Sequence, residues 1–514
     1  MDFDFSFILF LTSTFVFVFV FVFTFALFKT TKYSNKNLPP GPRKLPFIGN
    51  LHLLSGSAPP HHVLANLATK HGPLMHLKLG EISALVVSTP ETAEHFLKAN
   101  DAVFSSRPSL LAPEINCYGN TDIAFAPYGD YWRQLRKICS LQLFTAKRVG
   151  SFRPIRKEEV SNLCKSVAMR AGEAINLTEK IAAANLNIMV KAAFGKKSDG
   201  EVFELNSIIK EAQEFVTCFN VVDVYPSWRL LRVFSGMRRK IERHHELLDK
   251  ILESIIEERR NARGNDEGDG DGDGDGDGDG NLLDVLLRLQ GDGSLQIPLT
   301  TDNIKSVLMD GAGVESSTTA TDWAMAEMLK NPRVLKKAQD EVRSVFDGKN
   351  QVDESRFHEL KYLKLVIKET LRLHPPGPLL LPRESREHCV IDRYQIPAKT
   401  WVLVNAWAIG RDPNQWEDPE SFKPERFLEK QIDFKANNTF QYIPFGGGRR
   451  ICPAIGFGIA NIEIQMAMLL YHFDWILPHG IKPEDLDMKE SSGLSGKRKC
   501  DLTLIPVVKR PLLQ

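Results

Sequence analysis

The chain has 514 residues, of which 43% are apolar and 25% charged, as in ordinary globular proteins. Its formal net charge is only +1, so no overall electrostatic field favours a nucleic-acid partner. The seven cysteines are scattered, odd in number and form no C-x-x-C pair, which argues against a disulfide framework and a structural zinc site. A reducing compartment fits this cysteine usage best.

The first predicted element is the uncharged run at residues 6–28, which is rich in Phe and Val. As a helix rising ~1.5 Å per residue, it just covers a hydrocarbon core of ~30 Å. The Phe–Val alternation favours a strand, but a lone strand in lipid leaves its backbone unpaired, so we predict one transmembrane helix. A cleaved signal peptide is the alternative, although the run is too long and no small-residue cleavage site follows. Lysines follow the run, which predicts a cytoplasmic location for everything after it.

A proline-rich hinge follows, with Pro-Pro-Gly-Pro at residues 39–42. Successive prolines prevent the membrane helix from continuing, so this segment is expected to orient the soluble body on the membrane. A generic linker is the alternative. The predicted organisation is therefore an anchor at residues 1–29, a hinge at 30–50 and one large domain at 51–514.

The start of this domain alternates between two types of element. Strand-like runs at residues 74–79 and 84–88 precede a helical run at 90–100, and residues 107–126 have the mixed polarity of an irregular loop. Loops of this length are usually functional or disordered.

Trp132 and Arg136 are four residues apart, so they share one face of a predicted helix. An indole N–H and a guanidinium on one face can both donate to a carboxylate. An exposed amphipathic helix without a ligand is the alternative.

Residues 158–259 are helical in pattern, with an apolar break near residues 224–228. A Gly–Asp repeat at residues 269–280 then has nothing apolar to bury and repels itself, so a disordered insert is predicted at about 264–280. Calcium-binding repeats are the sharper alternative, but they need regular apolar positions that this tract lacks.

Residues 301–330 are predicted to form one long helix that ends at an Asn-Pro pair. Its middle contains two glycines and a cluster of hydroxyl side chains, which are poor choices for a helix interior. Glu315 beside Ser316 has the chemistry of a proton-relay pair, with the hydroxyl near a bound oxygen species and the carboxylate near water. A kink filled by small residues is the alternative.

Glu369 and Arg372 are three residues apart on one predicted helical face, and Arg426 lies in a proline-rich segment downstream. A surface ion pair is the plain interpretation of the first two residues. His374 is interpreted as structural, and the prolines at residues 374–383 predict an extended backbone.

The most informative stretch is residues 445–454, in which three consecutive glycines precede Cys452. The glycines let the backbone turn tightly and approach a bulky group. A buried helix is predicted directly afterwards, and the positive end of its dipole favours the thiolate form of the cysteine. With the cation of Arg450 nearby, this suits an axial bond to a haem iron. A buried structural cysteine is the alternative.

The pattern F-x-x-G-x-R-x-C, formed by Phe445, Gly448, Arg450 and Cys452, resembles the haem-binding signature of the cytochrome P-450 family, the haem-thiolate monooxygenases. Ala454 departs from the family, which usually has glycine there. The resemblance extends from residue 39 to about 511, with five motifs in the family's order. It implies a mainly α fold with a smaller β-rich part.

The resemblance also implies roles for the residues singled out above. The cofactor is haem b, with Cys452 as the ligand of the iron. Ser316 stands where the family has threonine, and with Glu315 it would deliver protons. Glu369, Arg372 and Arg426 would form the family's E-x-x-R clamp, and residues 107–126 and 377–381 would border the substrate pocket. Near the C-terminus, a turn flanked by strand-like runs is expected to place Leu494 over the same pocket. The other cofactor-binding residues are expected to be Trp132, Arg136, Arg383, Arg450, Phe445 and Gly448.

The implied activity is insertion of one atom of O2 into a small apolar plant metabolite. Electrons would come from NADPH through a separate NADPH-cytochrome P-450 reductase, at the endoplasmic-reticulum membrane with the catalytic domain facing the cytosol. The ending of the chain looks most like plant microsomal members that hydroxylate terpenoids. The alternatives are desaturation, rearrangement or coupling, a phenylpropanoid or alkaloid substrate, and a haem electron carrier without turnover. A lipid bilayer is an expected partner, and nucleic acid is not.

Overall fold

The computed structural model describes residues 12–18, 20, 37–195, 208, 211, 215, 220–228, 230–231, 235–266, 280–310, 314–348, 352–429, 432–434 and 439–512. Most of the apolar run at 6–28, the first part of the hinge and nearly all of the Gly–Asp repeat lie outside these residues. Within the described part of the chain, no helix combines the length and the hydropathy needed to cross a bilayer.

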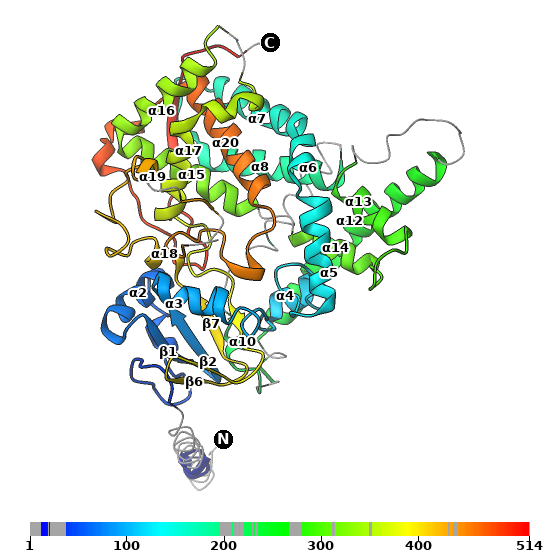
Figure 1. Ribbon diagram of the computed structural model, residues 1–514, viewed down its shortest axis with the longest axis vertical. Helices are drawn as coiled ribbons and strands as arrows, with labels where there is room; N and C mark the ends of the chain where they lie inside the picture. The colour runs from blue at the N-terminus through cyan, green and yellow to red at the C-terminus, as the bar shows by residue number, and fades with distance from the viewer. Residues whose placement is uncertain are drawn as a thin grey trace, which may run out of the picture.

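Helices make up most of the fold (Figure 1). This confirms the prediction of a mainly α protein. In chain order the α-helices are α2 (Pro60–His71), α3 (Pro90–Glu94), α4 (Leu111–Asn116), α5 (Asp130–Ile138), α6 (Ala146–Ser151), α7 (Arg153–Ala168), α8 (Leu177–Phe194), α10 (Val221–Val224), α12 (Met237–Asp266), α13 (Leu282–Gly291), α14 (Thr301–Asp310), α15 (Val314–Lys330), α16 (Pro332–Val345), α17 (Lys361–Leu373), α18 (Ala406–Ile409), α19 (Arg426–Glu429) and α20 (Ile455–His472).

The main sheet lies at the end of the molecule nearest the N-terminus (Figure 1). It has the order β1 (Leu74–Leu79), β2 (Ile82–Val87), β7 (Trp401–Val404) and β4 (Arg383–Glu384). The β1–β2 pair is an antiparallel hairpin, and β2 runs parallel to β7. All four side chains of β7 are buried, which suits its continuous apolar sequence because such strands are covered on both faces.

Two smaller sheets complete the β part. A three-stranded sheet has the order β3 (Ile175–Asn176), β9 (Thr503–Val508) and β8 (Phe473–Ile476). A two-stranded hairpin joins β5 (Cys389–Ile391) to β6 (Tyr394–Ile396). The smaller β-rich part that the sequence predicts is therefore present.

The helical core is built around α20 and α15, which pack against each other. Helix α20 also packs against α7, α16 and α17. Its second half is buried on nearly every side, as expected for a helix that is apolar all round. This arrangement fixes the start of α20, and so the loop before it, in the middle of the molecule.

The E-x-x-R clamp forms, and it is buried rather than a surface ion pair. Arg372 makes a two-pronged contact with the Glu369 carboxylate at 2.7 and 2.8 Å, and Arg426 Nε lies 3.0 Å from Glu369 Oε1. The remaining N–H groups of Arg372 donate to the carbonyl oxygens of Gly410 and Pro419, at 2.6 and 2.7 Å. These bonds satisfy the buried charges within the chain.

Two predictions of local structure are wrong. Residues 107–126 are not irregular throughout, because α4 forms within them. Residues 374–383 are not simply extended, because Leu380 adopts φ +52° and its N–H donates to Gly377 O at 2.9 Å. The positive φ belongs to Leu380, which is not a glycine, so the prolines and the glycine of this segment do not predict the turn.

The long helix at 301–330 is described as α14 and α15. Residues 311–313, with the predicted glycines, lie between them and outside the described residues. The predicted break near residues 224–228 is confirmed, because α10 ends at Val224 and the next residues form a turn.

Candidate active site

The loop before α20 folds back on itself around its glycines. Gly446 has φ +75° and Gly448 has φ +66°, a region that favours glycine. A Cβ atom on Gly448 would lie 2.1 Å from the Leu97 carbonyl oxygen, so no larger residue fits there. The backbone N–H of Cys452 then donates to Phe445 O at 3.1 Å and closes the loop.

Cys452 is partly buried, and α20 begins three residues after it, at Ile455. The sulfur therefore lies close to the positive end of a long helix dipole, which stabilises a thiolate. Phe445, at the start of the loop, packs edge-on against Phe434, with ring centroids 5.5 Å apart. This contact holds the loop against the helical core.

Three arginines from different parts of the chain meet at this loop, and we call them the arginine cluster: Arg136, Arg383 and Arg450. Arg136 Nη1 donates to Ile451 O and Arg383 Nη2 donates to Gly447 O, both at 2.6 Å. Two of the predicted cofactor-binding arginines are therefore bonded directly to the backbone of the cysteine loop.

Arg450, the third member of the cluster, contacts Trp132. The Arg450 guanidinium stacks on the Trp132 ring, 4.3 Å from its centroid. Both side chains donate to the Ile123 carbonyl oxygen, at 3.2 and 3.0 Å. Arg450 Nε also donates to Ser105 O at 2.7 Å. Helix α5, with Trp132 and Arg136 on one face, is thereby fixed against the loop.

The electrostatics of the cluster indicate a place for an anion. Burial lowers the pKa of Arg450 to about 9, and the positive charges of Arg383 and Arg136 add to this effect. Asp101 contacts Arg383 at 2.8 Å, but one carboxylate cannot neutralise three guanidinium groups. Burial raises the pKa of the nearby Asp122 to about 6, so this carboxylate also carries charge at neutral pH, but two carboxylates still do not balance three guanidinium groups.

The residues present therefore fit a haem. Its two propionates would neutralise the excess positive charge, and the sulfur would supply the iron ligand. Leu380 offers an apolar wall beside the loop, because its Cδ1 lies 3.8 Å from the position of a Cβ on Gly446.

Glu315 and Ser316 lie in the first turn of α15. Ser317, the next residue, is buried, and its Oγ lies 3.7 Å from the position of a Cβ on Gly458 in α20. The turn with the predicted relay pair therefore borders the helix that follows Cys452, with Ser316 on an exposed face.

The structure adds two residues that sequence reasoning missed. Lys497 Nζ lies 3.8 Å from Glu315 Oε1, and the Glu315 side chain is 29% exposed. Asp101 binds Arg383 and accepts from the backbone N–H of Arg449 at 2.8 Å. Both residues stand in ordinary polar stretches, so no spacing or composition distinguishes them.

Together these groups suit an anionic prosthetic group, and a cysteine sulfur lies in the same loop. A model of the cytochrome P450 family matches residues 39–504. The chain therefore belongs to the cytochrome P450 family. It is a haem b enzyme, a monooxygenase that uses O2, a small-molecule substrate and electrons from a redox partner.

Its relatives are plant enzymes of similar length. The chain is 50% identical to salviol synthase of Salvia pomifera over 487 residues, which is 94% of each chain. It is 50% identical to desmethyl-deoxy-podophyllotoxin synthase of Sinopodophyllum hexandrum, over 93% of this chain and 94% of that one. Identity to premnaspirodiene oxygenase of Hyoscyamus muticus is 49%, over 94% and 95%.

The fold also matches a solved structure. A zebrafish cytochrome P450 solved with progesterone superposes with a TM-score of 0.73 at 25% sequence identity, covering 87% of this chain and 99% of that one.

Proposed function

We propose that this monooxygenase hydroxylates a small apolar terpenoid, with electrons from NADPH delivered by a separate NADPH-cytochrome P450 reductase. The substrate class is supported by the similarity to salviol synthase and premnaspirodiene oxygenase, which are terpenoid oxygenases. The equal identity to desmethyl-deoxy-podophyllotoxin synthase favours a second candidate, a phenylpropanoid-type substrate.

The observation that carries the haem-dependent activity in this proposal is the excess positive charge beside the Cys452 loop. In our proposal Cys452 is the iron ligand, and Arg136, Arg383, Arg450 and Trp132 hold the propionates. When bound, the haem supplies O2 activation, which the amino acids alone cannot provide. Gly448 keeps the loop close to η2 (His95–Ala99), and Phe445 anchors the start of the loop.

We assign proton delivery to Glu315 and Ser316. The partly exposed Glu315 carboxylate can exchange protons with water, and Ser316, one residue further on, can hydrogen-bond an oxygen species. Lys497, which lies near the C-terminus, attracts the Glu315 carboxylate through its positive charge, with its Nζ 3.8 Å from Glu315 Oε1. The loss of a methyl group relative to threonine leaves this hydroxyl chemistry intact.

We further propose the domain organisation and the location that the sequence predicts: a membrane anchor at 1–29, a hinge at 30–50, and a catalytic domain at 51–514 on the cytosolic face of the endoplasmic reticulum. Support comes from exposed apolar side chains on two adjoining segments. Leu45 and Phe47 are 42% and 46% exposed, and Trp228 and Leu230 are 52% and 70% exposed. Tyr225 Oη donates to Phe47 O at 3.3 Å and joins the segments into one patch suited to a lipid surface.

The test is expression in microsomes with a plant reductase, followed by product analysis against terpenoid and phenylpropanoid panels. Hydroxylated terpenoid products that depend on NADPH are expected. Products from phenylpropanoids alone would favour the second candidate. Desaturated, rearranged or coupled products without an added oxygen atom would contradict hydroxylation.

The ligand assignment has its own test. Cys452→Ala is expected to abolish the carbon-monoxide difference band of the reduced protein, because no thiolate remains to bind the iron. A retained band would refute the assignment of Cys452.

A further inference from the structure

A loop near the C-terminus lies beside both the segment predicted to border the substrate and the proposed proton donor Glu315. We call this loop, residues 490–498, the C-terminal loop. A β-bridge between Glu490 and Arg498 closes its base. Leu494, at its tip, packs against an apolar cluster that includes Leu379, in the segment predicted to border the substrate. Lys497 lies 3.8 Å from the Glu315 carboxylate. The position of this loop therefore affects both the pocket wall and the predicted proton donor.

Backbone contacts hold the tip of the loop in place. The Gly496 N–H donates to Pro376 O at 3.0 Å, and Trp323 Nε1 of α15 donates to Gly496 O at 2.7 Å. A Cβ on Gly496 would lie 2.7 Å from Pro375 O, so this approach requires glycine. The tip thus lies against the same turn that carries Leu379.

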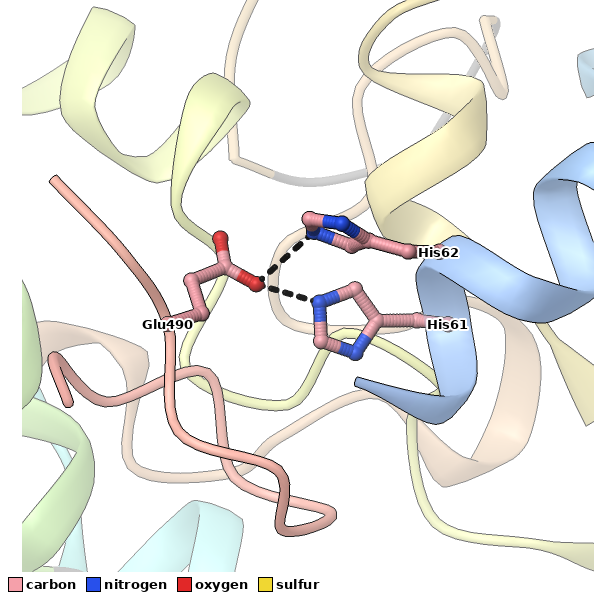
Figure 2. Close-up of side chains that lie close together, drawn as sticks. All are labelled: His61, His62 and Glu490. Atoms are coloured by element: carbon pink, nitrogen blue, oxygen red, sulfur yellow. Dashed lines mark hydrogen bonds and ion pairs between the residues drawn. The ribbon is translucent and has the colours of Figure 1, made fainter. Parts of the chain in front are cut away.

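The base of the loop is held by an unusual cluster of side chains. Figure 2 shows Glu490 on the C-terminal loop facing two successive histidines at the start of α2. The Nε2 atoms of His61 and His62 donate to the same Glu490 oxygen, His62 at 3.1 Å. His374 Nδ1 lies 3.6 Å from the other carboxylate oxygen. One carboxylate therefore joins α2, the end of α17 and the C-terminal loop, from three distant parts of the chain.

Each histidine is itself held rigidly. His61 is fully buried, and its carbonyl oxygen accepts from Asn405 Nδ2 at 2.9 Å. The His62 ring packs on Trp407, with centroids 4.2 Å apart. These contacts fix the direction in which the two donors point.

His374 is fixed from two sides. It stacks on Trp323, with ring centroids 3.8 Å apart and planes 4° apart. Its Nε2 lies 2.7 Å from Glu327 Oε1. This confirms the structural interpretation of His374 and adds α15 to the elements that Glu490 connects.

The Glu490 carboxylate is strongly held in its charged form. Burial alone would raise its pKa, but the nearby His374 ring and the hydrogen bonds from His61 and His62 outweigh burial and keep the pKa well below its usual range. Burial lowers the pKa of His61, and the nearby Arg411 adds to this, so a neutral ring donates to the carboxylate. A buried carboxylate that loses such donors would leave this arrangement for water.

We propose that Glu490 is a positioning residue for substrate oxidation, because with His61 and His62 it fixes the base of the C-terminal loop and so the placement of Leu494 and Lys497. The inference rests on the proposed function and deepens it by naming what sets the geometry of the pocket wall. It predicts that weakening this cluster redistributes products and lowers coupling, while the haem remains bound.

The test compares Glu490→Gln and His62→Leu with the wild-type holoenzyme, reconstituted with reductase and an accepted terpenoid. Each variant is expected to weaken substrate binding, measured from the spin-state change of the haem spectrum, by about five-fold or more, as for loss of one charge-assisted hydrogen bond. The ratio of regioisomeric products should change, and less product should form per NADPH consumed. His62→Gln keeps an N–H donor near Nε2 and should restore most of the wild-type values.

Two matched controls exclude a general loss of stability. Lys489→Gln changes the exposed neighbour of Glu490, and His71→Leu changes a histidine at the other end of α2. Both should match the wild type, with all proteins assayed at equal haem content and well below their unfolding temperatures. Unchanged product ratio, substrate affinity and coupling in Glu490→Gln would overturn the inference. A wild-type enzyme without any product would instead contradict the proposed function.

His61, His62 and Glu490 are also residue types that bind zinc. Because both imidazoles already donate to one oxygen, we interpret the cluster as held together by hydrogen bonds and not by a metal ion. Dialysis of the holoenzyme against EDTA should therefore leave the product ratio unchanged, and a change reversed by Zn²⁺ would overturn this interpretation.

Discussion

The E-x-x-R clamp and the arginine cluster are both sets of buried charges, but they are satisfied in different ways. In the clamp, two guanidinium groups share the Glu369 carboxylate, and their other N–H groups meet backbone carbonyls. Every contact is made by the chain itself. The clamp joins α17 to the segment before α19 and needs nothing else to be stable.

In the arginine cluster, by contrast, the positive charges are not all paired with carboxylates in the described part of the chain. Its guanidinium groups repel one another, and burial together with this repulsion lowers the pKa of Arg450 to about 9. Carbonyl oxygens satisfy the hydrogen-bond donors but do not cancel the charge. In the clamp both guanidinium groups contact a carboxylate, whereas Arg136 and Arg450 in the cluster contact backbone carbonyl oxygens, which leave their charge uncompensated and suit a ligand of the opposite sign.

Breaking the clamp should have the largest effect. Glu369→Ala leaves two arginines buried without their carboxylate, which should destabilise the protein by roughly 3–5 kcal/mol. We expect little folded protein and no haem spectrum, checked by thermal unfolding and soluble yield. Glu173→Ala is the matched control, because Glu173 and Arg170 form the same i,i+3 pair on the surface, where its loss should cost at most about 1 kcal/mol. Equal stability of the two variants would contradict the claim that the buried clamp stabilises the protein more than a surface ion pair does.

Removing one member of the arginine cluster should spare the fold and weaken the cofactor site. Arg136→Leu should lower haem affinity by about ten-fold, as for loss of one charge-assisted hydrogen bond. Haem titration of the apoprotein measures this, with far-UV circular dichroism to follow the fold. Arg133→Leu, on the same helix but 59% exposed, is the control and should bind haem normally. If Arg136→Leu bound haem as tightly as the wild type, Arg136 would not hold a propionate.

A partly buried carboxyl group, Glu463, extends the comparison through the pH dependence of stability. Burial raises the pKa of Glu463, on α20, to about 7, although Lys364 opposes the shift. The folded state therefore holds a proton that the unfolded state, with a pKa near 4.5, releases. The stability due to the neutral form is fully present below pH 4.5 and is lost as the pH rises through about 7.

Glu463→Gln mimics the neutral form, so it should match the wild type near pH 4.5 and exceed it by about 1–2 kcal/mol at pH 8. Denaturant unfolding at several pH values measures this difference. A gain that did not depend on pH would mean that packing, and not charge, limits stability at this position.

The smallest effect is expected away from both clusters. Ser316→Ala should reduce product formed per NADPH consumed by a factor of about 2–10, because a bound water can replace part of the hydrogen bonding of the hydroxyl. Haem content and stability should not change. Ser316→Thr, which restores the family's residue, should couple at least as well as the wild type. Unchanged coupling in the alanine variant would remove Ser316 from the proton relay.

Much of the site can be predicted from the sequence because its motifs are local. The glycines before Cys452, the i,i+4 pair of Trp132 and Arg136, and the i,i+3 pair of Glu369 and Arg372 are each defined by spacing within one element. The structure places these residues in the predicted elements. Their roles toward the cofactor stay predictions, because the contacts seen here are with the protein itself.

The errors have local causes as well. Helix α4 forms in a segment whose mixed polarity gave no clear period, and a packed neighbour can stabilise so short a helix where its own sequence does not. The turn at Leu380 depends on a non-glycine residue with positive φ, which sequence preference disfavours and tertiary contacts impose.

The sequence by itself determined the family, the cysteine loop and the clamp, because backbone geometry and short spacings are encoded within a few residues. Only the tertiary structure decided the partners of these groups: Asp101 for Arg383, 282 positions away, Lys497 for Glu315, and Glu490 for His61, 429 positions away. Such pairs leave no periodic or compositional trace, since two charged residues in separate polar stretches look alike whether they meet in space or not. Packing of segments that are far apart in the chain, among them α2, α15 and the C-terminal loop, brings these residues together.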